Sequence, residues 1–250
     1  MKKPVSACLV IIGNEILSGR TQDKNLAHLA LTLNETGVQL REVRVIPDVE
    51  SVIVATINTV RAQYDYVFTT GGIGPTHDDI TSASIAKAFG VPIHRHPDAA
   101  RALLAHYTPE QVNEARMKMA DVPLGATLVP NAVSTAPGFR MENVYVMAGV
   151  PRIMQAMLDA ILPELKGGAT VLSLSVTTNL GEGAIAQGLT AIQDRYADID
   201  IGSYPMYKAG EVSTTLVLRS PDAARNAAAM AEVHALIRDC GGAITETPGA

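Results

Sequence analysis

The stretch Gly71-Gly72-Ile73-Gly74-Pro75-Thr76-His77-Asp78-Asp79-Ile80-Thr81 decides the fold of this 250-residue chain. It follows a short apolar run, Tyr64–Thr70, that is typical of a buried strand, and it precedes a helical pattern that ends at Gly90. Glycines between a strand and a helix let backbone N–H groups approach an anion, and the helix N-terminus adds positive potential. Glycines also serve tight connections, so a phosphate site and a plain turn both stay open at this point.

The segments around this loop alternate between strand and helix patterns. Apolar runs at 6–12 and 38–46 indicate strands, while 25–33 and 52–60 have apolar residues at helical spacing. A hairpin pattern follows at 139–147. Strands that alternate with helices of this length predict right-handed βαβ units and a mostly parallel α/β sheet.

A second domain is expected after Lys166-Gly167-Gly168, which divides the chain into 1–167 and 168–250. Behind this boundary the strand and helix patterns follow the order βαββαβ, which is the order of a smaller α+β ferredoxin-like unit. This second part contains no evident catalytic cluster. We therefore expect it to serve packing or oligomerisation, and we expect the protein to be a homo-oligomer.

The composition is that of an ordinary globular protein and argues against a nucleic-acid partner. Twenty Lys and Arg against 25 Asp and Glu give a net charge of −5, whereas nucleic-acid binding depends on clustered cations. The apolar stretch from Ala7 to Ile12 is too short to span a bilayer, so we expect no membrane partner. Cys8 and Cys240 have no metal or redox spacing, which predicts two buried free thiols in a cytoplasmic protein.

Three predicted strands end in residues that suit a ligand site. The first is followed by Gly13-Asn14-Glu15, the second by Pro47-Asp48, and the third by the loop that begins at Gly71. Ala148-Gly149-Val150-Pro151 is a fourth segment of this kind. Because the carboxyl ends of parallel strands lie along one edge of a sheet, we expect these segments to form one site.

Asp78 and Asp79 stand at the predicted start of the helix after the glycine loop. Helix capping alone explains such carboxylates and is worth ~0.5–2 kcal/mol. Beside a phosphate site, however, two carboxylates repel the ligand unless a cation bridges them, and oxygen ligands with phosphate are the usual surroundings of Mg²⁺. With Asp48 as a second ligand or a base, the residues predict a metal-assisted phosphoryl or nucleotidyl site.

The eleven-residue loop resembles the GGxGxxxxDxT signature of the molybdopterin-binding (MoaB/Mog) domain. The segment 13–19 with Asn25 is similar to the opening of the CinA (competence/damage-inducible) N-terminal domain, and 136–139 and 149–151 fit that family too. The segment 21–25 is also similar to the molybdopterin-binding-like domain of eukaryotic FAD synthases. The resemblance covers essentially the whole chain, and it implies a three-layer α/β/α domain of the MogA/MoaB type.

The resemblance also implies residue roles. In Mog-type adenylyltransferases two acidic positions support metal-dependent transfer of adenylate to molybdopterin, and they match Asp48 and Asp79. We expect Mg²⁺, Mn²⁺ or Co²⁺ at these two catalytic carboxylates, with Asp78 as a further metal candidate, and a phosphate-containing ligand that is a molybdopterin or a nucleotide. The residues expected to bind this ligand are Gly13, Glu15, Ser18, Gly19, Asn25, Gly71, Gly72, Gly74, Pro75, Thr76, Gly138 and Gly149.

Relatives of the CinA and FAD-synthase types are associated with metal-dependent pyrophosphate cleavage of ADP-ribose or FAD. The leading interpretation is therefore a divalent-metal-dependent nucleotide pyrophosphatase. Two alternatives stay open: a molybdopterin adenylyltransferase-like enzyme of molybdenum cofactor biosynthesis, and a pterin- or nucleotide-binding module without turnover.

Overall fold

The computed structural model describes residues 5–208 and 211–245. The chain divides into two compact units, Met1–Ala169 and Thr170–Ala250, each with a core of its own. The strands of the first unit are β1 (Val5–Ile12), β2 (Val38–Ile46), β3 (Tyr66–Thr70), β4 (Ile93–Arg95), β5 (Asp121–Pro123), β6 (Thr127–Val129), β7 (Gly138–Met141) and β8 (Val144–Met147). Its helices are α1 (Asn14–Leu17), α2 (Asn25–Glu35), α3 (Glu50–Gln63), α4 (Thr81–Phe89), α5 (Pro97–His106), η1 (Pro109–Gln111), α6 (Glu114–Met117), η2 (Lys118–Ala120), α7 (Pro151–Ile161) and η3 (Leu162–Glu164).

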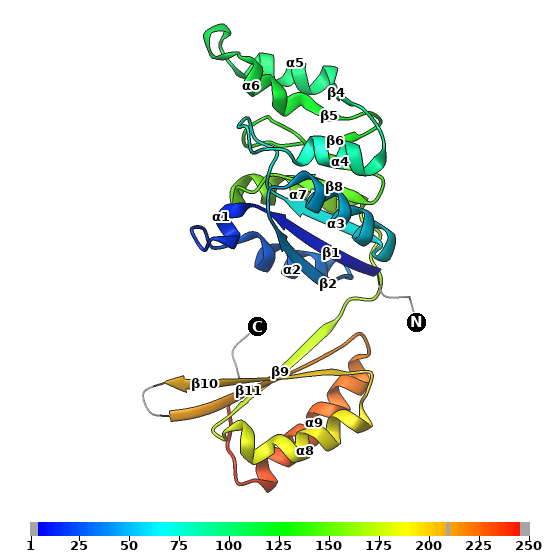
Figure 1. Cartoon of the computed structure of the whole chain (residues 1–250). Helices are drawn as coiled ribbons and strands as arrows, with labels where there is room; N and C mark the ends of the chain where they lie inside the picture. Colours follow the sequence, from blue (N-terminus) through cyan, green and yellow to red (C-terminus); the bar gives the residue numbers. More distant parts are fainter. Residues whose placement is uncertain (1–4, 209–210, 246–250) are drawn as a thin grey trace. The chain divides into compact units, whose positions relative to one another are not determined.

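The central sheet of the first unit has six strands in the order β2-β1-β3-β8-β7-β6 (Figure 1). The four strands from β2 to β8 are parallel, and β7 and β6 extend the sheet by antiparallel pairing. The tight turn between β7 and β8 contains Glu142, which has a φ of 52°. The structure therefore confirms both the mostly parallel sheet and the hairpin near its far edge.

Alternation along β1 explains why the sheet is covered on both faces. Ala7, Leu9 and Ile11 are packed in a cluster with buried residues of α2 and α7, while Cys8, Val10 and Ile12 are packed in a cluster with buried residues of α3 and α4. Each of these six side chains is at most 3% exposed. A strand that is apolar on both faces needs a helical layer on each side, so the three-layer α/β/α architecture is confirmed.

The segment 97–120 leaves the main sheet between β4 and β5, which pair with each other as a separate two-stranded sheet. Pro109 interrupts the helical pattern, as expected, because α5 ends at His106 and the next helical turn begins at Pro109 itself. Four buried side chains give this excursion a small core of its own: Ala99, Leu103, Met117 and Ala120.

The second unit has the element order βαββαβ. Its elements are β9 (Leu172–Thr178), α8 (Glu182–Arg195), β10 (Asp200–Lys208), β11 (Glu211–Ser220), α9 (Ala223–Asp239) and β12 (Ile244–Thr245). The antiparallel sheet has the order β10-β11-β9-β12, and the buried side chains of α8 and α9 pack against it. The ferredoxin-like expectation is confirmed; positions 209–210, between β10 and β11, lie outside the described residues.

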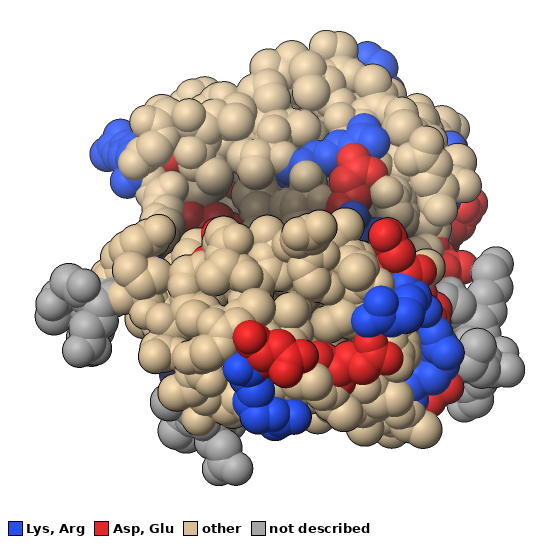
Figure 2. Space-filling model, turned by 90° about the horizontal axis from the view of Figure 1, so that it is seen from below, with Lys and Arg blue, Asp and Glu red and all other residues tan. Residues whose placement is uncertain are grey.

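The prediction of two buried thiols is half wrong. Cys8 is fully buried in β1, but Cys240 is exposed because it follows the last buried turn of α9 and caps that helix. Figure 2 shows Lys and Arg side chains beside Asp and Glu side chains, rather than one large basic patch, on the face that it draws. Within the described ranges, we find no helix with the length and hydropathy of a membrane span.

Candidate functional site

The ends of three adjacent parallel strands meet at the glycine loop. A Cβ atom on Gly71 would lie 2.1 Å from the carbonyl oxygen of Ile12, which is the last residue of β1. A Cβ atom on Gly149, which follows β8, would lie 3.3 Å from the Cα atom of Gly71. The backbones that leave β1, β3 and β8 are therefore in direct contact, as the topology of the sheet predicted.

Asp48 joins the end of β2 to the same edge. Its Oδ2 atom accepts a 2.8 Å hydrogen bond from the backbone N–H of Asn14, the first residue of α1. The neighbouring N–H of Gly13 donates to the carbonyl of Ile46 at 3.1 Å. The carboxylate of Glu15 folds back over Gly13, because its oxygens lie within 2.6 Å of the place where a Cβ atom on Gly13 would stand.

The glycine loop itself is held in a conformation that favours glycine. Gly71 and Gly72 have φ angles of 101° and 71°, and their carbonyls accept hydrogen bonds from the Thr81 hydroxyl at 3.0 Å and the Thr81 N–H at 2.9 Å. Among the described residues, no acceptor is hydrogen-bonded to the backbone N–H groups of Gly72, Ile73 and Gly74. Three successive free N–H groups are suited to binding an anion.

Asp79 turns back onto this loop. Its Oδ2 atom accepts hydrogen bonds from the backbone N–H of Thr76 at 2.8 Å and from the Thr76 hydroxyl at 2.5 Å. The helix α4 begins only at Thr81 and has no side-chain cap, so the expectation that the two carboxylates start the helix is wrong. The Asp79 carboxylate closes a turn within the loop instead of capping α4.

The neighbouring Asp78 has an exposed side chain. The nearby Thr76 hydroxyl, the backbone at Asp78 and the neighbouring His77 and Lys118 lower the pKa of the Asp78 carboxyl below its usual value. Asp78 therefore stays ionised at neutral pH.

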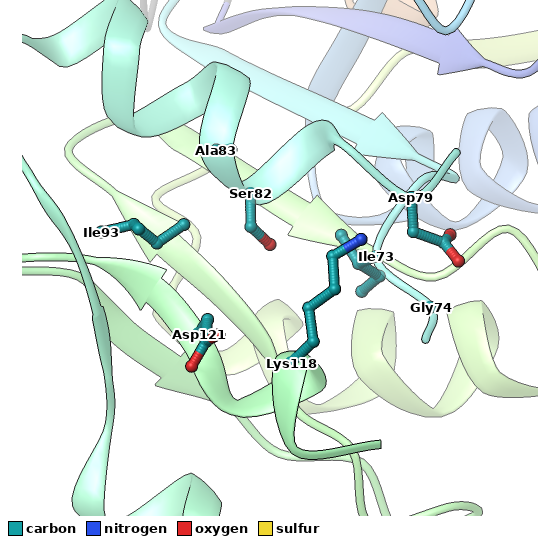
Figure 3. A pocket seen from close by; sticks show the side chains of 8 residues that line it. All are labelled: Ile73, Gly74, Asp79, Ser82, Ala83, Ile93, Lys118 and Asp121. Atoms are coloured by element: carbon teal, nitrogen blue, oxygen red, sulfur yellow. The ribbon is translucent and has the colours of Figure 1, made fainter. Parts of the chain in front are cut away.

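A pocket of about 140 Å³ lies beside the loop (Figure 3). Ile73, Gly74 and Asp79 form one side of it, and the side chain of Lys118 extends toward them from the end of the excursion 97–120. The residues that complete its lining are Ser82, Ala83, Ile93 and Asp121. The pocket thus combines apolar walls with one cation and two carboxylates.

The pocket unites only some of the residues expected from the sequence. Gly74 and Asp79 line it, whereas Asp48 does not and lies with Asn14 at the end of β2. Asn25 is buried and donates a 2.8 Å hydrogen bond from Nδ2 to the carbonyl of Gly149, so these two expected ligand residues contact each other at the edge of the sheet.

The remaining expected ligand residues have other surroundings. Ser18 caps α1 and donates to the carbonyl of Glu15 at 3.2 Å, and Gly19 continues that turn with a φ of 72°. Pro75 is exposed. Gly138 is buried, and a Cβ atom there would lie 2.4 Å from the carbonyl oxygen of Val146, so close strand packing accounts for this glycine.

The acidic residues do not form a complete metal cage. In the part of the chain that the structure describes, no group of three or more His, Cys, Asp or Glu side chains is placed to hold a metal ion. The Oδ1 atoms of Asp48 and Asp79 have no hydrogen-bond partner among these residues, so each carboxylate keeps one oxygen for a ligand. A Mg²⁺-like ion takes one or two carboxylates and completes its shell with water and phosphate oxygens, so either carboxylate has an oxygen that could serve as one such ligand.

Reasoning from the sequence missed Lys118, Ser82 and Asp121. Ser82 directly follows the eleven-residue stretch 71–81, and this adjacency in the sequence is a usable signal. Lys118 comes from the end of the excursion 97–120 and Asp121 begins β5 directly after it, and neither belongs to a motif. Only the packing of that excursion brings them to the loop.

Comparison with known proteins gives the relationship of both units. Residues 8–167 match the family described as "Probable molybdopterin binding domain", and residues 170–240 match "FAD synthase, middle domain". A protein of Archaeoglobus fulgidus is 34% identical over 79% of this chain and 84% of its own length. A CinA-like protein of Desulfovibrio desulfuricans is 31% identical over 88% of this chain, which spans about half, 52%, of that relative.

Among solved structures, the protein CinA from Thermoplasma acidophilum is similar to this chain over part of its length. It is 32% identical, with a TM-score of 0.61, and the alignment covers 65% of this chain and 99% of that protein. Fold, loop signature and sequence similarity agree. The chain therefore belongs to the CinA-like members of the molybdopterin-binding (MoaB/Mog) domain family.

Proposed function

We propose that the protein is a divalent-metal-dependent nucleotide pyrophosphatase that acts on an ADP-ribose- or FAD-like substrate. The observation that carries the proposal is the row of free N–H groups at Gly72, Ile73 and Gly74 beside the Asp79 carboxylate. An anion-binding loop next to a carboxylate suits a phosphate group that is bound together with a cation. The match of residues 170–240 to the middle domain of FAD synthase supports a dinucleotide-like substrate class.

Asp48 and Asp79 would hold the metal ion through their free Oδ1 atoms. The metal would neutralise phosphate charge and lower the pKa of a bound water molecule. The Thr76 N–H and hydroxyl fix the rotamer of Asp79, and the Asn14 N–H does the same for Asp48, so both carboxylates are oriented before the substrate binds.

The rest of the site would orient a diphosphate. The free N–H groups of the loop would bind phosphate oxygens, and the apolar side chains of Ile73, Ala83 and Ile93 would exclude water from the attached group. In the reaction a water oxygen forms a bond to phosphorus and the P–O bond of the diphosphate bridge breaks, so that ADP-ribose yields AMP and ribose 5-phosphate.

Incubation of the protein with ADP-ribose or FAD, each with Mg²⁺, Mn²⁺ or Co²⁺, tests this function. We expect AMP as a product that appears only when a divalent ion is present. Failure to release AMP under all six conditions would contradict the pyrophosphatase proposal. Ligand-dependent thermal shifts without product would favour a binding module.

A molybdopterin adenylyltransferase is the second candidate, and the match of residues 8–167 to the molybdopterin-binding family favours it. The same loop would then bind the phosphates of ATP and the pterin. Incubation with molybdopterin, ATP and Mg²⁺ distinguishes the two reactions, because only this activity forms an adenylylated pterin and releases pyrophosphate.

A further inference from the structure

Lys118 is held in place at the pocket by its neighbours in the chain. It begins η2 and lies between Met117 and Ala120, which are 6% and 0% exposed in the small core of the excursion 97–120. Its side chain extends toward the glycine loop (Figure 3). Its Nζ atom donates a 2.8 Å hydrogen bond to the carbonyl of Thr76. Packing of the neighbouring buried residues thus fixes the backbone of Lys118, and its ammonium group points toward the loop.

The charge of Lys118 is not balanced by an ion pair. None of the described carboxylates lies within ion-pairing distance of its Nζ atom, and it is the one cation that lines the pocket. The nearby Arg95 differs, because its guanidinium pairs with Asp121 at 2.9 Å and with Glu114 at 3.1 Å. An ammonium group has three N–H donors, and the bond to Thr76 uses one of them.

Thr76 links this cation to the carboxylate across the loop. Its N–H and hydroxyl donate to Asp79, while its carbonyl accepts from Lys118. Thr76 therefore binds one negative and one positive side chain, and both line the pocket beside Gly74. A phosphate group can accept a charge-assisted hydrogen bond from this ammonium group, whereas a neutral ligand gains no ionic attraction from it.

We propose that Lys118 is a phosphate-binding residue of this pocket, and that it selects ligands with a diphosphate group. The proposal takes the ligand class from the proposed function and adds the residue that recognises it. A diphosphate brings at least two negative charges toward Asp78 and Asp79. A single divalent ion neutralises only part of the resulting repulsion between ligand and carboxylates, and the ammonium group of Lys118 reduces the remainder. In a purely structural role, Lys118 would only fasten the loop to the excursion.

Binding without turnover tests the proposal. We would measure Kd for α,β-methylene-ADP-ribose, whose bridge is not hydrolysed, and for inorganic pyrophosphate by calorimetry with Mg²⁺, for the unmodified protein and for Lys118→Gln, Lys118→Arg and Lys87→Gln. Lys87→Gln removes the same charge, but from an exposed residue of α4 that pairs with Glu50 and does not line the pocket. We expect Lys118→Gln to raise both Kd values about 10- to 100-fold, while Lys118→Arg and Lys87→Gln stay within about threefold.

Salt dependence separates recognition from loop fastening. If Lys118 contacts phosphate, the Kd for pyrophosphate of the unmodified protein rises with NaCl more steeply than that of Lys118→Gln. Parallel salt curves, an unchanged Kd in Lys118→Gln, or no binding of either probe to the unmodified protein would each overturn the proposal. A lower unfolding midpoint with an unchanged Kd would show that the residue only fastens the loop.

The AMP-release assay keeps this proposal distinct from the proposed function. Lys118-dependent binding by a protein that releases no AMP would sustain the phosphate role and contradict the pyrophosphatase. If the unmodified protein releases AMP, and Lys118→Gln binds the diphosphate probes with the same Kd as the unmodified protein, the pyrophosphatase proposal stands and the role of Lys118 is overturned.

Discussion

The side-chain amide of Asn25 donates a 2.8 Å hydrogen bond to the carbonyl oxygen of Gly149, a residue 124 positions further along the chain. Asn25 begins α2, and Gly149 follows β8 and contacts Gly71. Through this bond the start of α2 holds the turn after β8, the last parallel strand along the chain. The Oδ1 atom of Asn25 is buried without a partner among the described residues, so it remains an acceptor at the edge of the site.

Replacement of Asn25 tests this link. Asn25→Ala removes the donor for the Gly149 carbonyl, and we expect a loss of about 1–2 kcal/mol in the free energy of unfolding. Asn25→Asp should destabilise at least as much, because it places a carboxylate oxygen against the carbonyl in a residue that is 3% exposed. Urea unfolding measures both, and a free energy of unfolding equal to that of the unmodified protein would show that the bond does not hold the turn.

The two carboxylates of the loop should differ in their effect on turnover. In Asp79→Asn the amide oxygen can still accept from Thr76, so we expect a stability loss below about 1 kcal/mol. Removal of one charge from a hard-cation site should lower metal-dependent AMP release about 100-fold or more, and Asp48→Asn should behave similarly. Asp78→Asn should lose much less, because its side chain is exposed and does not line the pocket.

Asp159→Asn, in an exposed position of α7, is the matched control for the change in net charge. Equal losses in Asp78→Asn and Asp79→Asn would contradict the assignment of Asp79. Near-native AMP release by Asp79→Asn would show that Asp79 only stabilises the turn and does not take part in the reaction.

Two glycines with positive φ angles, Gly90 and Gly71, allow the cost of backbone strain to be distinguished from the cost of a close backbone contact. Gly90 ends α4 with a φ of 66°, and a Cβ atom there would meet nothing within 4 Å, so Gly90→Ala should cost about 1–2 kcal/mol of backbone strain. Gly71→Ala adds the contact at 2.1 Å with the backbone of Ile12, which cannot move without shifting β1. We expect a loss of about 3 kcal/mol or more for Gly71→Ala. Similar urea midpoints for the two variants would mean that the strand ends are not in close contact.

The two thiols should be easy to distinguish. Burial, with a smaller contribution from Glu42, raises the pKa of the Cys8 thiol to about 11, so this group stays protonated and inaccessible near neutral pH. We expect one thiol, Cys240, to react with Ellman's reagent in the native protein and two to react in urea. Two fast thiols in the native protein would contradict the burial of Cys8.

The raised pKa of Cys8 also gives a pH dependence. Between the ordinary pKa of 9.0 and about 11, the unfolded chain loses a thiol proton that the folded chain keeps, so stability falls as pH rises. The difference in the free energy of unfolding between the unmodified protein and Cys8→Ala should shrink by up to about 1.4 kcal/mol per pH unit in this window. A constant difference across the window would contradict the shift.

The sequence allowed the prediction of the strand ends, because alternating strands and helices leave little choice of topology. Gly13, Asp48, Gly71 and Gly149 lie at one edge for that reason. The position of Lys118 at the pocket could not be predicted from the sequence, because it depends on how the short, irregular turns between β4 and β5 pack. The turn-closing role of Asp79 could not be predicted either, because it depends on where α4 begins, and that boundary differs by two residues from the expected one.

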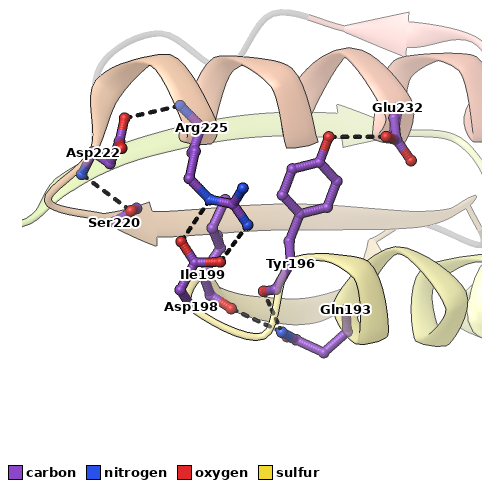
Figure 4. A network of polar contacts seen from close by, with 8 residues as sticks. All are labelled: Gln193, Tyr196, Asp198, Ile199, Ser220, Asp222, Arg225 and Glu232. Atoms are coloured by element: carbon purple, nitrogen blue, oxygen red, sulfur yellow. Dashed lines mark hydrogen bonds and ion pairs between the residues drawn. The ribbon is translucent and has the colours of Figure 1, made fainter.

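The second unit has the contacts of a self-sufficient domain. Arg225 of α9 binds both oxygens of Asp198 at 2.6 and 2.5 Å, and the Tyr196 hydroxyl donates to Glu232 at 2.9 Å (Figure 4). Gln193 closes the end of α8 with hydrogen bonds to the carbonyls of Tyr196 and Ile199. These bonds fasten the turn between α8 and β10 to α9 without help from the first unit.

Because the loop, Asp48, Asp79 and Lys118 all lie in the first unit, the second unit should not be needed for ligand binding. We expect a chain that ends at Ala169 to fold cooperatively and to bind ADP-ribose with a Kd within about threefold of that of the full chain, since its core and pocket are its own. Calorimetry measures the affinity, circular dichroism checks the fold, and light scattering shows whether the assembly state changes. A folded 1–169 chain that has lost all affinity for ADP-ribose would place part of the binding site in the second unit, and Glu182, which accepts a hydrogen bond from Ser203 at 2.5 Å, would be the first residue to replace there.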